Sequence, residues 1–286
     1  MRVLIFGVTG MLGNTLFKYL NKKNDYDVIG TSRSSSKKGY FSQQLVKKII
    51  HFDDITSQNS LQNFINQANP DIVINCIGVI KQLKSALDPL YTIPINSLLP
   101  HYLNKICTHM NIRLVHFSTD CVFNGKQGFY DETDKMTAND LYGMSKYLGE
   151  VKSKNSLTIR TSIIGHELST KNGLVEWFLS QKSKVFGYKN AFFNGLPTIE
   201  IAEILDNYLL KDKSINGLFH VSGQKISKFD LLNIINKVYN KNIEIIPTCD
   251  FKIDRTLNSE KFYIKTNYTS PNWDKLIKKM HDFETL

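Results

Sequence analysis

The sequence predicts an α/β fold in which helices cover both faces of a doubly wound parallel sheet. Short, continuously apolar runs such as residues 3–6 and 72–76 alternate with segments of helical periodicity. A glycine-rich turn directly follows the first of these runs. Strands separated by helices imply right-handed crossovers, which produce a parallel sheet.

The elements of the first half are expected to alternate strictly. The expected strands and helices, in chain order, are residues 3–6, 13–23 (helix), 27–31, 48–52, 61–68 (helix), 72–76, 95–110 (helix) and 114–118. In such a sheet the ligand lies outside the carboxyl ends of the strands, where Gly7, Gly78 and Thr119 fall.

The pattern changes after an expected strand at residues 157–160. The later segments are expected to be helices at 174–181, 198–210 and 228–239, with short apolar segments at 185–186, 218–221 and 243–246. We therefore divide the chain into a first domain, residues 1–160, and residues 161–286. The second part is expected to be mainly a lobe that forms one wall of the substrate cleft, with some segments returning to the sheet.

Length and composition narrow the class of protein. The 286 residues, 42% of them hydrophobic, suffice for one large core with a smaller lobe attached. No apolar stretch reaches the ~20 residues that cross a bilayer, and residues 3–6 read as a strand rather than as part of a signal peptide. The four cysteines have no metal-ligand spacing. We expect a cytoplasmic protein with reduced thiols, no metal site and no membrane contact.

The formal net charge of +10 raises the question of nucleic acid as a partner. The lysines occur singly or in doublets, and neither a helix-turn-helix nor a zinc motif is visible. A solvated, lysine-biased surface is therefore expected, without nucleic-acid binding. The same charge is compatible with a positively charged entrance to a binding site for a phosphate-bearing substrate. The sequence is also compatible with a homodimer.

The glycine-rich turn, residues 7–13, follows a strand and opens a helix, which is the context of a dinucleotide fingerprint. Gly7 permits the tight turn, Gly10 lets the backbone approach a pyrophosphate, and Gly13 lets helix and strand pack closely. The G-x-x-G-x-x-G spacing departs by one residue from the usual form. We expect a Rossmann-like, dinucleotide-binding first domain whose turn contacts the cofactor through Gly7, Thr9, Gly10, Met11, Leu12 and Gly13.

The end of the second strand indicates which nicotinamide cofactor is used. No acidic residue stands where one would hold a free ribose 2′-hydroxyl, whereas Ser32 and Arg33 suit a 2′-phosphate. Lys37 or Lys38 would assist. NADPH is therefore favoured, with NADH left open, and the pair Asp54-Ile55 is expected to flank the adenine.

Tyr142 and Lys146 lie one helical turn apart, downstream of a strand that ends at Thr119. The phenol would hand a proton to a carbonyl oxygen while a nicotinamide delivers hydride to its carbon. We expect the lysine charge to lower the phenol pKa, and Thr119 to hydrogen-bond the same oxygen. A second Tyr-x-x-x-Lys pair, Tyr19 and Lys23, is not preceded by such a threonine-terminated strand and is expected to be structural.

With these motifs the chain resembles the extended short-chain dehydrogenases/reductases, and most closely the dTDP-4-dehydrorhamnose reductase family. The resemblance implies a cytoplasmic enzyme that reduces the 4-keto group of a nucleotide-linked 6-deoxy sugar with NAD(P)H, in the synthesis of cell-surface polysaccharide precursors. It also implies catalytic roles for Thr119, Tyr142 and Lys146. The segments that carry it are residues 6–13, 75–78, 96–100, 118–125, 142–150, 160–162 and 195–198.

Further roles follow from the same resemblance. Cys76, Ile77 and Gly78 would line the cofactor beside Tyr142 and Lys146, and Asp120 and Ser162 would meet the substrate, although Asp120 could equally cap its turn. The family's usual aromatic residue after Arg-Thr-Ser is Ile163 here, and the usual proline before Tyr142 is missing. These departures leave the sugar and the nucleotide open, dTDP- or UDP-linked, and suit an amino sugar.

Two alternatives remain. A nucleotide-sugar dehydratase would carry an Asp-Glu pair after the threonine, whereas Cys121 follows Asp120 here, and an epimerase would retain NAD, which fits Arg33 poorly. A non-catalytic NADP-binding regulatory protein is the second alternative, and the presence of Thr119, Tyr142 and Lys146 together argues against it.

Overall fold

The computed structural model describes residues 1–34 and 39–285. Lys37 and Lys38, named above for the cofactor phosphate, lie outside these residues. Within the described part of the chain, no helix has both the length and the apolar character needed to cross a membrane.

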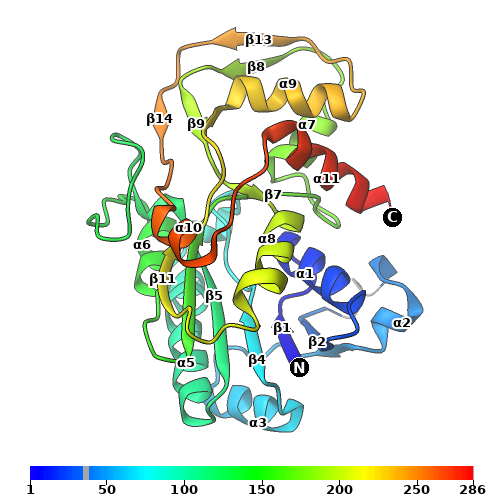
Figure 1. Ribbon diagram of the computed structural model, residues 1–286, viewed down its shortest axis with the longest axis vertical. Coiled ribbons are helices and arrows are strands. Elements are labelled where there is room, and N and C mark those ends of the chain that lie inside the picture. Colours follow the sequence, from blue (N-terminus) through cyan, green and yellow to red (C-terminus); the bar gives the residue numbers. More distant parts are fainter. Residues whose placement is uncertain (35–38, 286) are drawn as a thin grey trace.

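A seven-stranded parallel sheet forms the centre of the molecule, in the order β11-β6-β5-β4-β1-β2-β3 (Figure 1). The predicted doubly wound parallel sheet is confirmed. Its strands are β1 (Arg2–Phe6), β2 (Asp27–Ser32), β3 (Ile49–His51), β4 (Ile72–Asn75), β5 (Arg113–Thr119), β6 (Ser156–Thr161) and β11 (Gly217–His220). The crossover from β3 to β4 reverses the direction in which strands are added, and the carboxyl ends on either side of β1 therefore meet at one edge.

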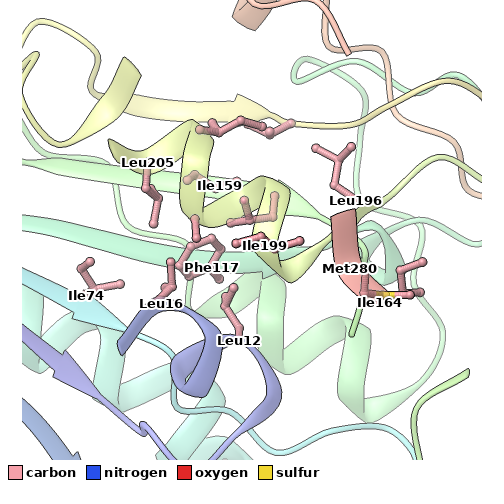
Figure 2. Packing of buried hydrophobic residues seen from close by; sticks show 14 of the residues in the cluster. Leu12, Leu16, Ile74, Phe117, Ile159, Ile164, Leu196, Ile199, Leu205 and Met280 are labelled. Atoms are coloured by element: carbon pink, nitrogen blue, oxygen red, sulfur yellow. The ribbon is translucent and has the colours of Figure 1, made fainter. Parts of the chain in front are cut away.

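Two hydrophobic clusters cover the faces of this sheet because its strands are apolar on both sides. Alternate strand residues such as Leu4 and Val73 pack against α3 (Gln58–Ala68) and α5 (Leu99–His109). Those of the other face, including Ile74 and Phe117, pack against the helices that Figure 2 shows closing over them. These helices are α1 (Met11–Asn21), α8 (Thr198–Ile204) and α11 (Trp273–Thr285).

A smaller lobe lies beyond the carboxyl ends of the strands (Figure 1). Its elements are α7 (Leu174–Leu179), β8 (Val185–Tyr188), β9 (Ala191–Phe193), β12 (Ile226–Ser227), α9 (Lys228–Val238), β13 (Ile245–Thr248) and β14 (Ile253–Asp254). In it β8 pairs with β13, and β9 pairs with β12 and β14. The pair β7 (Ile163–Ile164) and β10 (Leu196–Pro197) connects this lobe to the end of β6.

Several elements differ from expectation. The helix predicted at 95–110 is α4 (Pro89–Ile93), a π-helical segment (Pro94–Leu98) and α5, and the helix predicted at 198–210 is α8 followed by a second π-helical segment (Leu205–Leu209). Further helical elements include α2 (Gln43–Val46), the short 3-10 turns Lys84–Leu87 and Asp120–Val122, and α10 (Glu260–Thr266). The terminal helix α11 was not predicted either, although Trp273, Leu276, Ile277 and Met280 bury one of its faces.

Candidate active site

The glycine-rich turn is held in a conformation that requires its glycines. Gly7 has φ +85°, a conformation that side chains rarely adopt, and a Cβ on Gly13 would lie 2.2 Å from the Gly7 carbonyl oxygen. Gly10 is exposed and precedes α1 without any side-chain cap, so the first amides of the helix remain available to an anion. Thr9 and Met11 are half-buried and Leu12 is buried beside them.

The residues expected at the adenosine end lie at the neighbouring strand ends. The Ser32 hydroxyl donates to the Ser34 carbonyl at 2.8 Å, while Arg33 is exposed and reaches the Tyr91 hydroxyl at 3.4 Å. Asp54 is exposed and accepts from the Ser60 hydroxyl. Within residues 1–34 and 39–285, the guanidinium of Arg33 has this one long hydrogen bond and retains donors for a phosphate.

The end of β4 lies between the glycine turn and the tyrosine helix. Ile77 N donates to the Asn75 side chain at 3.1 Å, and a Cβ on Gly78 would lie 3.9 Å from Lys146 Nζ. Burial raises the pKa of the Cys76 thiol, with the Lys146 charge opposing the shift. Cys76, Ile77 and Gly78 therefore lie where the two halves of the site meet.

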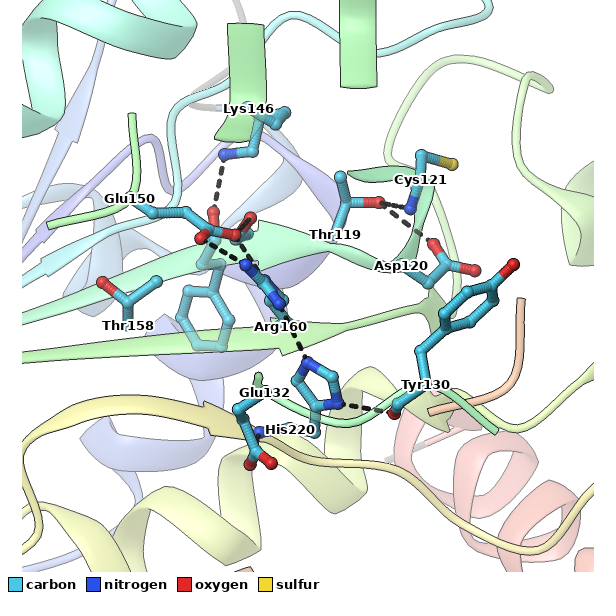
Figure 3. Close-up of polar contacts among 12 residues, drawn as sticks. Thr119, Asp120, Cys121, Tyr130, Glu132, Lys146, Glu150, Thr158, Arg160 and His220 are labelled. Carbon is cyan, nitrogen blue, oxygen red and sulfur yellow. Dashed lines mark hydrogen bonds and ion pairs between the residues drawn. The ribbon is translucent and has the colours of Figure 1, made fainter. Parts of the chain in front are cut away.

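Thr119 ends β5 and begins the turn that carries the next two residues (Figure 3). Its Oγ1 donates to Asp120 Oδ1 at 3.0 Å and accepts from Cys121 N at 3.1 Å. Burial raises the pKa of the Asp120 carboxyl, and the Arg255 charge is the largest opposing effect. Thr119 must turn its proton away from Asp120 before it can donate to a ligand.

Tyr142 and Lys146 lie one turn apart on α6 (Leu141–Leu148), whose N-terminus is capped by Asp140 accepting from Gly143 N at 2.8 Å. Burial raises the pKa of the Tyr142 phenol, and hydrogen bonding with Thr119 opposes the shift. The lowered phenol pKa expected from Lys146 is therefore wrong. Lys146 Nζ instead donates to the Phe117 carbonyl at 2.6 Å, and burial lowers its pKa to about 8.

The π-helical segment before α5 fixes the position of α6. Asn96 Nδ2 donates to Val79 O and to the Ser145 hydroxyl, both at 3.2 Å, and its Oδ1 accepts from Val79 N at 2.8 Å. Ser97 Oγ donates to the Ser145 carbonyl at 2.8 Å.

A buried ionic network lies beneath Lys146 (Figure 3). Arg160 donates to both oxygens of Glu150, at 2.6 and 2.7 Å, and Ser118 Oγ donates to the same carboxylate at 2.7 Å. Arg160 Nη1 also lies 3.3 Å from His220 Nε2. Because Glu150 lies two residues beyond the end of α6, the pair connects the end of that helix to β5, β6 and β11.

The lobe brings two cations to the site that sequence reasoning missed. Arg255 Nε donates to the Phe123 carbonyl at 2.8 Å, and its Nη1 lies 3.8 Å from Cys121 Sγ. Lys228 and Arg255 both act electrostatically on Asp120. More than 100 residues separate them from Asp120 in sequence, and no local pattern marks them.

Ser162, expected at the substrate, is half-buried after β6. Its carbonyl accepts from Leu196 N at 2.9 Å, and a Cβ on Gly195 would lie 2.1 Å from the same oxygen. The backbone of Ser162 therefore attaches the Gly195-Leu196 segment of the lobe to the sheet.

Comparison with known proteins identifies the family of this chain. The family model described as the RmlD substrate binding domain matches residues 1–281. The spore coat polysaccharide biosynthesis protein SpsK of Bacillus subtilis is 34% identical over 173 residues, and the match spans 58% of this chain and about half, 54%, of that protein. A dTDP-4-dehydrorhamnose reductase of Aggregatibacter actinomycetemcomitans is 26% identical over 262 residues, which cover 86% of this chain and 82% of that protein.

A solved structure shows the same fold over the whole chain. The dTDP-4-dehydrorhamnose reductase of Bacillus anthracis, in complex with NADP, has a TM-score of 0.81 at 21% identity and covers 100% of this chain and 99% of that one.

Proposed function

This chain belongs to the RmlD substrate binding domain family, and on that premise we propose that it is an NADPH-dependent reductase of the 4-keto group of a nucleotide-linked 6-deoxy sugar. The observation that carries the proposal is the position of Tyr142. It lies one helical turn from the buried Lys146 and interacts with Thr119. Thr119 ends β5 at the same edge of the sheet as the glycine turn.

The chain's own groups supply a proton donor and a binding site for the ketone oxygen. Tyr142, neutral because burial raises its pKa, would donate its phenolic proton to the oxygen as charge develops there. Thr119 would hydrogen-bond the same oxygen after turning away from Asp120. The Lys146 ammonium would stabilise the phenolate that remains. NADPH, when bound, supplies the hydride.

The residues present fit this cofactor. The uncapped start of α1 and the exposed Gly10 suit a pyrophosphate, and Arg33 with Ser32 suits a 2′-phosphate. The NADP bound to the Bacillus anthracis relative supports the same choice, and NADH remains the secondary cofactor. We propose that the enzyme acts in the cytoplasm, in the synthesis of cell-surface polysaccharide precursors. The similarity to SpsK, a spore coat polysaccharide biosynthesis protein, supports the role in polysaccharide synthesis.

The test is NADPH oxidation against a panel of dTDP- and UDP-linked 4-keto-6-deoxy sugars, with and without a 2-acetamido group. We expect one panel member to be reduced with one NADPH consumed for each product molecule formed. Turnover without net cofactor consumption would instead identify an epimerase or a dehydratase. Tight NADPH binding with no turnover on any member would favour a regulatory protein.

A further inference from the structure

The backbone that follows β4 is held by a side chain at the point where the sheet ends. Cys76 N still donates to the Phe6 carbonyl at 3.1 Å, in the pattern of the parallel sheet. Ile77 N donates instead to the side chain of Asn75, at 3.1 Å from Oδ1. Asn75 is the last residue of β4 and is buried. The direction in which the chain leaves the sheet therefore depends on the orientation of this one amide group.

Residues 76–78 lie between the two halves of the site. A Cβ on Gly7 would lie 3.0 Å from Ile77 Cγ1 and 3.4 Å from Ile77 N, so this segment packs directly against the glycine-rich turn. Gly78 is exposed, and a Cβ there would lie 3.9 Å from Lys146 Nζ. A displacement of Ile77 would therefore change the surface that a bound cofactor meets between the turn and Lys146.

His116 fixes the orientation of the Asn75 amide. It lies opposite Asn75 on the neighbouring strand β5, it is fully buried, and its Nδ1 lies 3.2 Å from Asn75 Nδ2. Because Asn75 Oδ1 accepts from Ile77 N, the amide NH₂ group faces His116, and His116 Nδ1 must be the acceptor. Burial lowers the pKa of His116 well below its ordinary value of 6.5, so the ring is neutral and Nδ1 can accept.

The other ring nitrogen of His116 has no such partner. A neutral ring whose Nδ1 accepts carries its proton on Nε2. Among residues 1–34 and 39–285, this buried Nε2 has no hydrogen-bond partner, and an unpaired buried donor is destabilising. The parallel pairing of β4 with β5 already joins the two strands. The histidine therefore destabilises the fold at one nitrogen, and what it supplies at the other is the acceptor for Asn75.

We propose that His116 is a positioning residue for the nicotinamide cofactor, because it holds the Asn75 amide and through it the Ile77 backbone between the glycine-rich turn and Lys146. Since it is fully buried in the sheet, His116 acts through these two residues and not by contact with the cofactor. The inference rests on the proposed function, because it takes residues 76–78 to line the nicotinamide half of NADPH. Loosening of groups that hold a reacting ring in place weakens its binding and slows its reaction.

Two variants of equal shape separate the hydrogen bond from the packing. Leucine and asparagine are isosteric, and only asparagine offers Asn75 an acceptor at the position of Nδ1. His116→Leu should weaken NADPH binding about 10-fold, the equivalent of one lost hydrogen bond, and His116→Asn should bind within about threefold of the wild type. Calorimetric titration of the full chain measures both. His101→Leu, which removes an exposed histidine from α5, is the control and should bind like the wild type.

Adenosine 2′,5′-bisphosphate, which lacks the nicotinamide half, distinguishes local positioning from a general loss of structure. Its expected site at Ser32 and Arg33 follows β2, and β1 lies between β2 and β4. Its affinity should therefore be the same in the wild type and in both His116 variants. If His116→Leu lost affinity for this fragment and for NADPH equally, the histidine would be structural and the proposal overturned. Equal NADPH affinities of the two isosteric variants would overturn it as well.

The protonation of His116 in the wild type gives an arm that does not depend on the folding of any variant. Long-range ¹H–¹⁵N correlation spectra should show the proton on Nε2 and none on Nδ1. A proton on Nδ1 would refute the role of His116, because Asn75 Nδ2 would then face a donor.

The same titrations separate this inference from the proposed function. A wild-type protein that reduces a nucleotide-linked 4-keto sugar with NADPH, together with an His116→Leu variant of normal NADPH affinity, would refute the role of His116 alone. A wild-type protein that does not bind NADPH would count against both.

Discussion

Lys146 Nζ donates to the Phe117 carbonyl at 2.6 Å. The ammonium group, one helical turn from Tyr142, is therefore hydrogen-bonded to the central sheet rather than to the phenol. The phenol pKa is accordingly raised by burial. A neutral phenol is the form that donates a proton during ketone reduction, and the raised pKa of Tyr142 therefore suits the reductive direction.

Replacing Tyr142 by Phe removes the proposed proton donor. We expect turnover to fall about 10²- to 10⁴-fold, the usual contribution of a positioned general acid, while NADPH affinity is retained. Steady-state rates and cofactor titration by fluorescence measure the two quantities. Tyr19→Phe is the matched control from the second Tyr-x-x-x-Lys pair, where the hydroxyl binds Asp206 at 3.2 Å. Equal rates for Tyr142→Phe and wild type would remove the tyrosine from the mechanism.

The activity should depend on the charge of Lys146. Its pKa is about 8, below the ordinary value for a lysine, so it is charged below pH 8 and neutral above. The single-turnover rate is therefore expected to fall as the pH rises through about 8. Lys146→Met should have a low rate without this transition. A rate that increases through the same interval would show that the neutral amine is the working form.

Arg33 is expected to distinguish NADPH from NADH. Its guanidinium is exposed and reaches the Tyr91 hydroxyl at 3.4 Å, so its removal should cost little stability. Arg33→Ala should weaken NADPH binding about 10- to 100-fold, because a charge-assisted bidentate contact is lost. NADH affinity serves as the internal control and should remain within about twofold. A parallel loss for both cofactors would place Arg33 away from the 2′-phosphate.

The Glu150–Arg160 pair is expected to be structural and costly to break. Both side chains are 3% exposed, so Glu150→Gln leaves a buried guanidinium without its carboxylate. We expect a loss of ~3–5 kcal/mol in the free energy of unfolding, and a smaller loss for the double variant Glu150→Gln/Arg160→Met. Denaturant titrations of the double-mutant cycle measure both. Asp27→Asn breaks the exposed pair with Arg2 and should cost less than ~1 kcal/mol. Similar losses for the two pairs would contradict this account.

Acid should destabilise the protein through His220. Burial and the Arg160 charge lower its pKa to about 3, against the ordinary 6.5 of an unfolded histidine. Between pH 6.5 and 3 the unfolded chain therefore binds a proton that the folded chain does not, and stability falls as the pH decreases. The slope from this residue approaches ~1.4 kcal/mol per pH unit. In His220→Asn the free energy of unfolding should depend less steeply on pH, and an unchanged slope would refute this contribution.

Sequence patterns were sufficient for the sheet because they report local physics. Buried strands such as β1 and β4 are continuous apolar runs. In the glycine-rich turn, a side chain at Gly13 would collide with the Gly7 carbonyl, so that position needs glycine. The helix α11 shows the same kind of signal, with Trp273, Leu276, Ile277 and Met280 at helical spacing, and could have been predicted from it.

The parts that sequence did not predict depend on tertiary structure. The pKa of Tyr142 is set by burial and by where the Lys146 ammonium finds its acceptor, which helical spacing does not specify. Lys228 and Arg255 approach Asp120 only because the lobe folds back over the ends of the strands. In a chain of net charge +10, the sequence around a single lysine or arginine does not reveal such a role.

Transfer of deuterium from NADPH labelled at the transferring C4 position tests the central claim most directly. With the accepted nucleotide-linked 4-keto sugar, we predict a product that carries one deuterium at sugar C4, detected by NMR, and one NADP⁺ released for each product molecule. A product without deuterium at C4, formed with no net change in the cofactor, would contradict the assignment of this chain as a reductase.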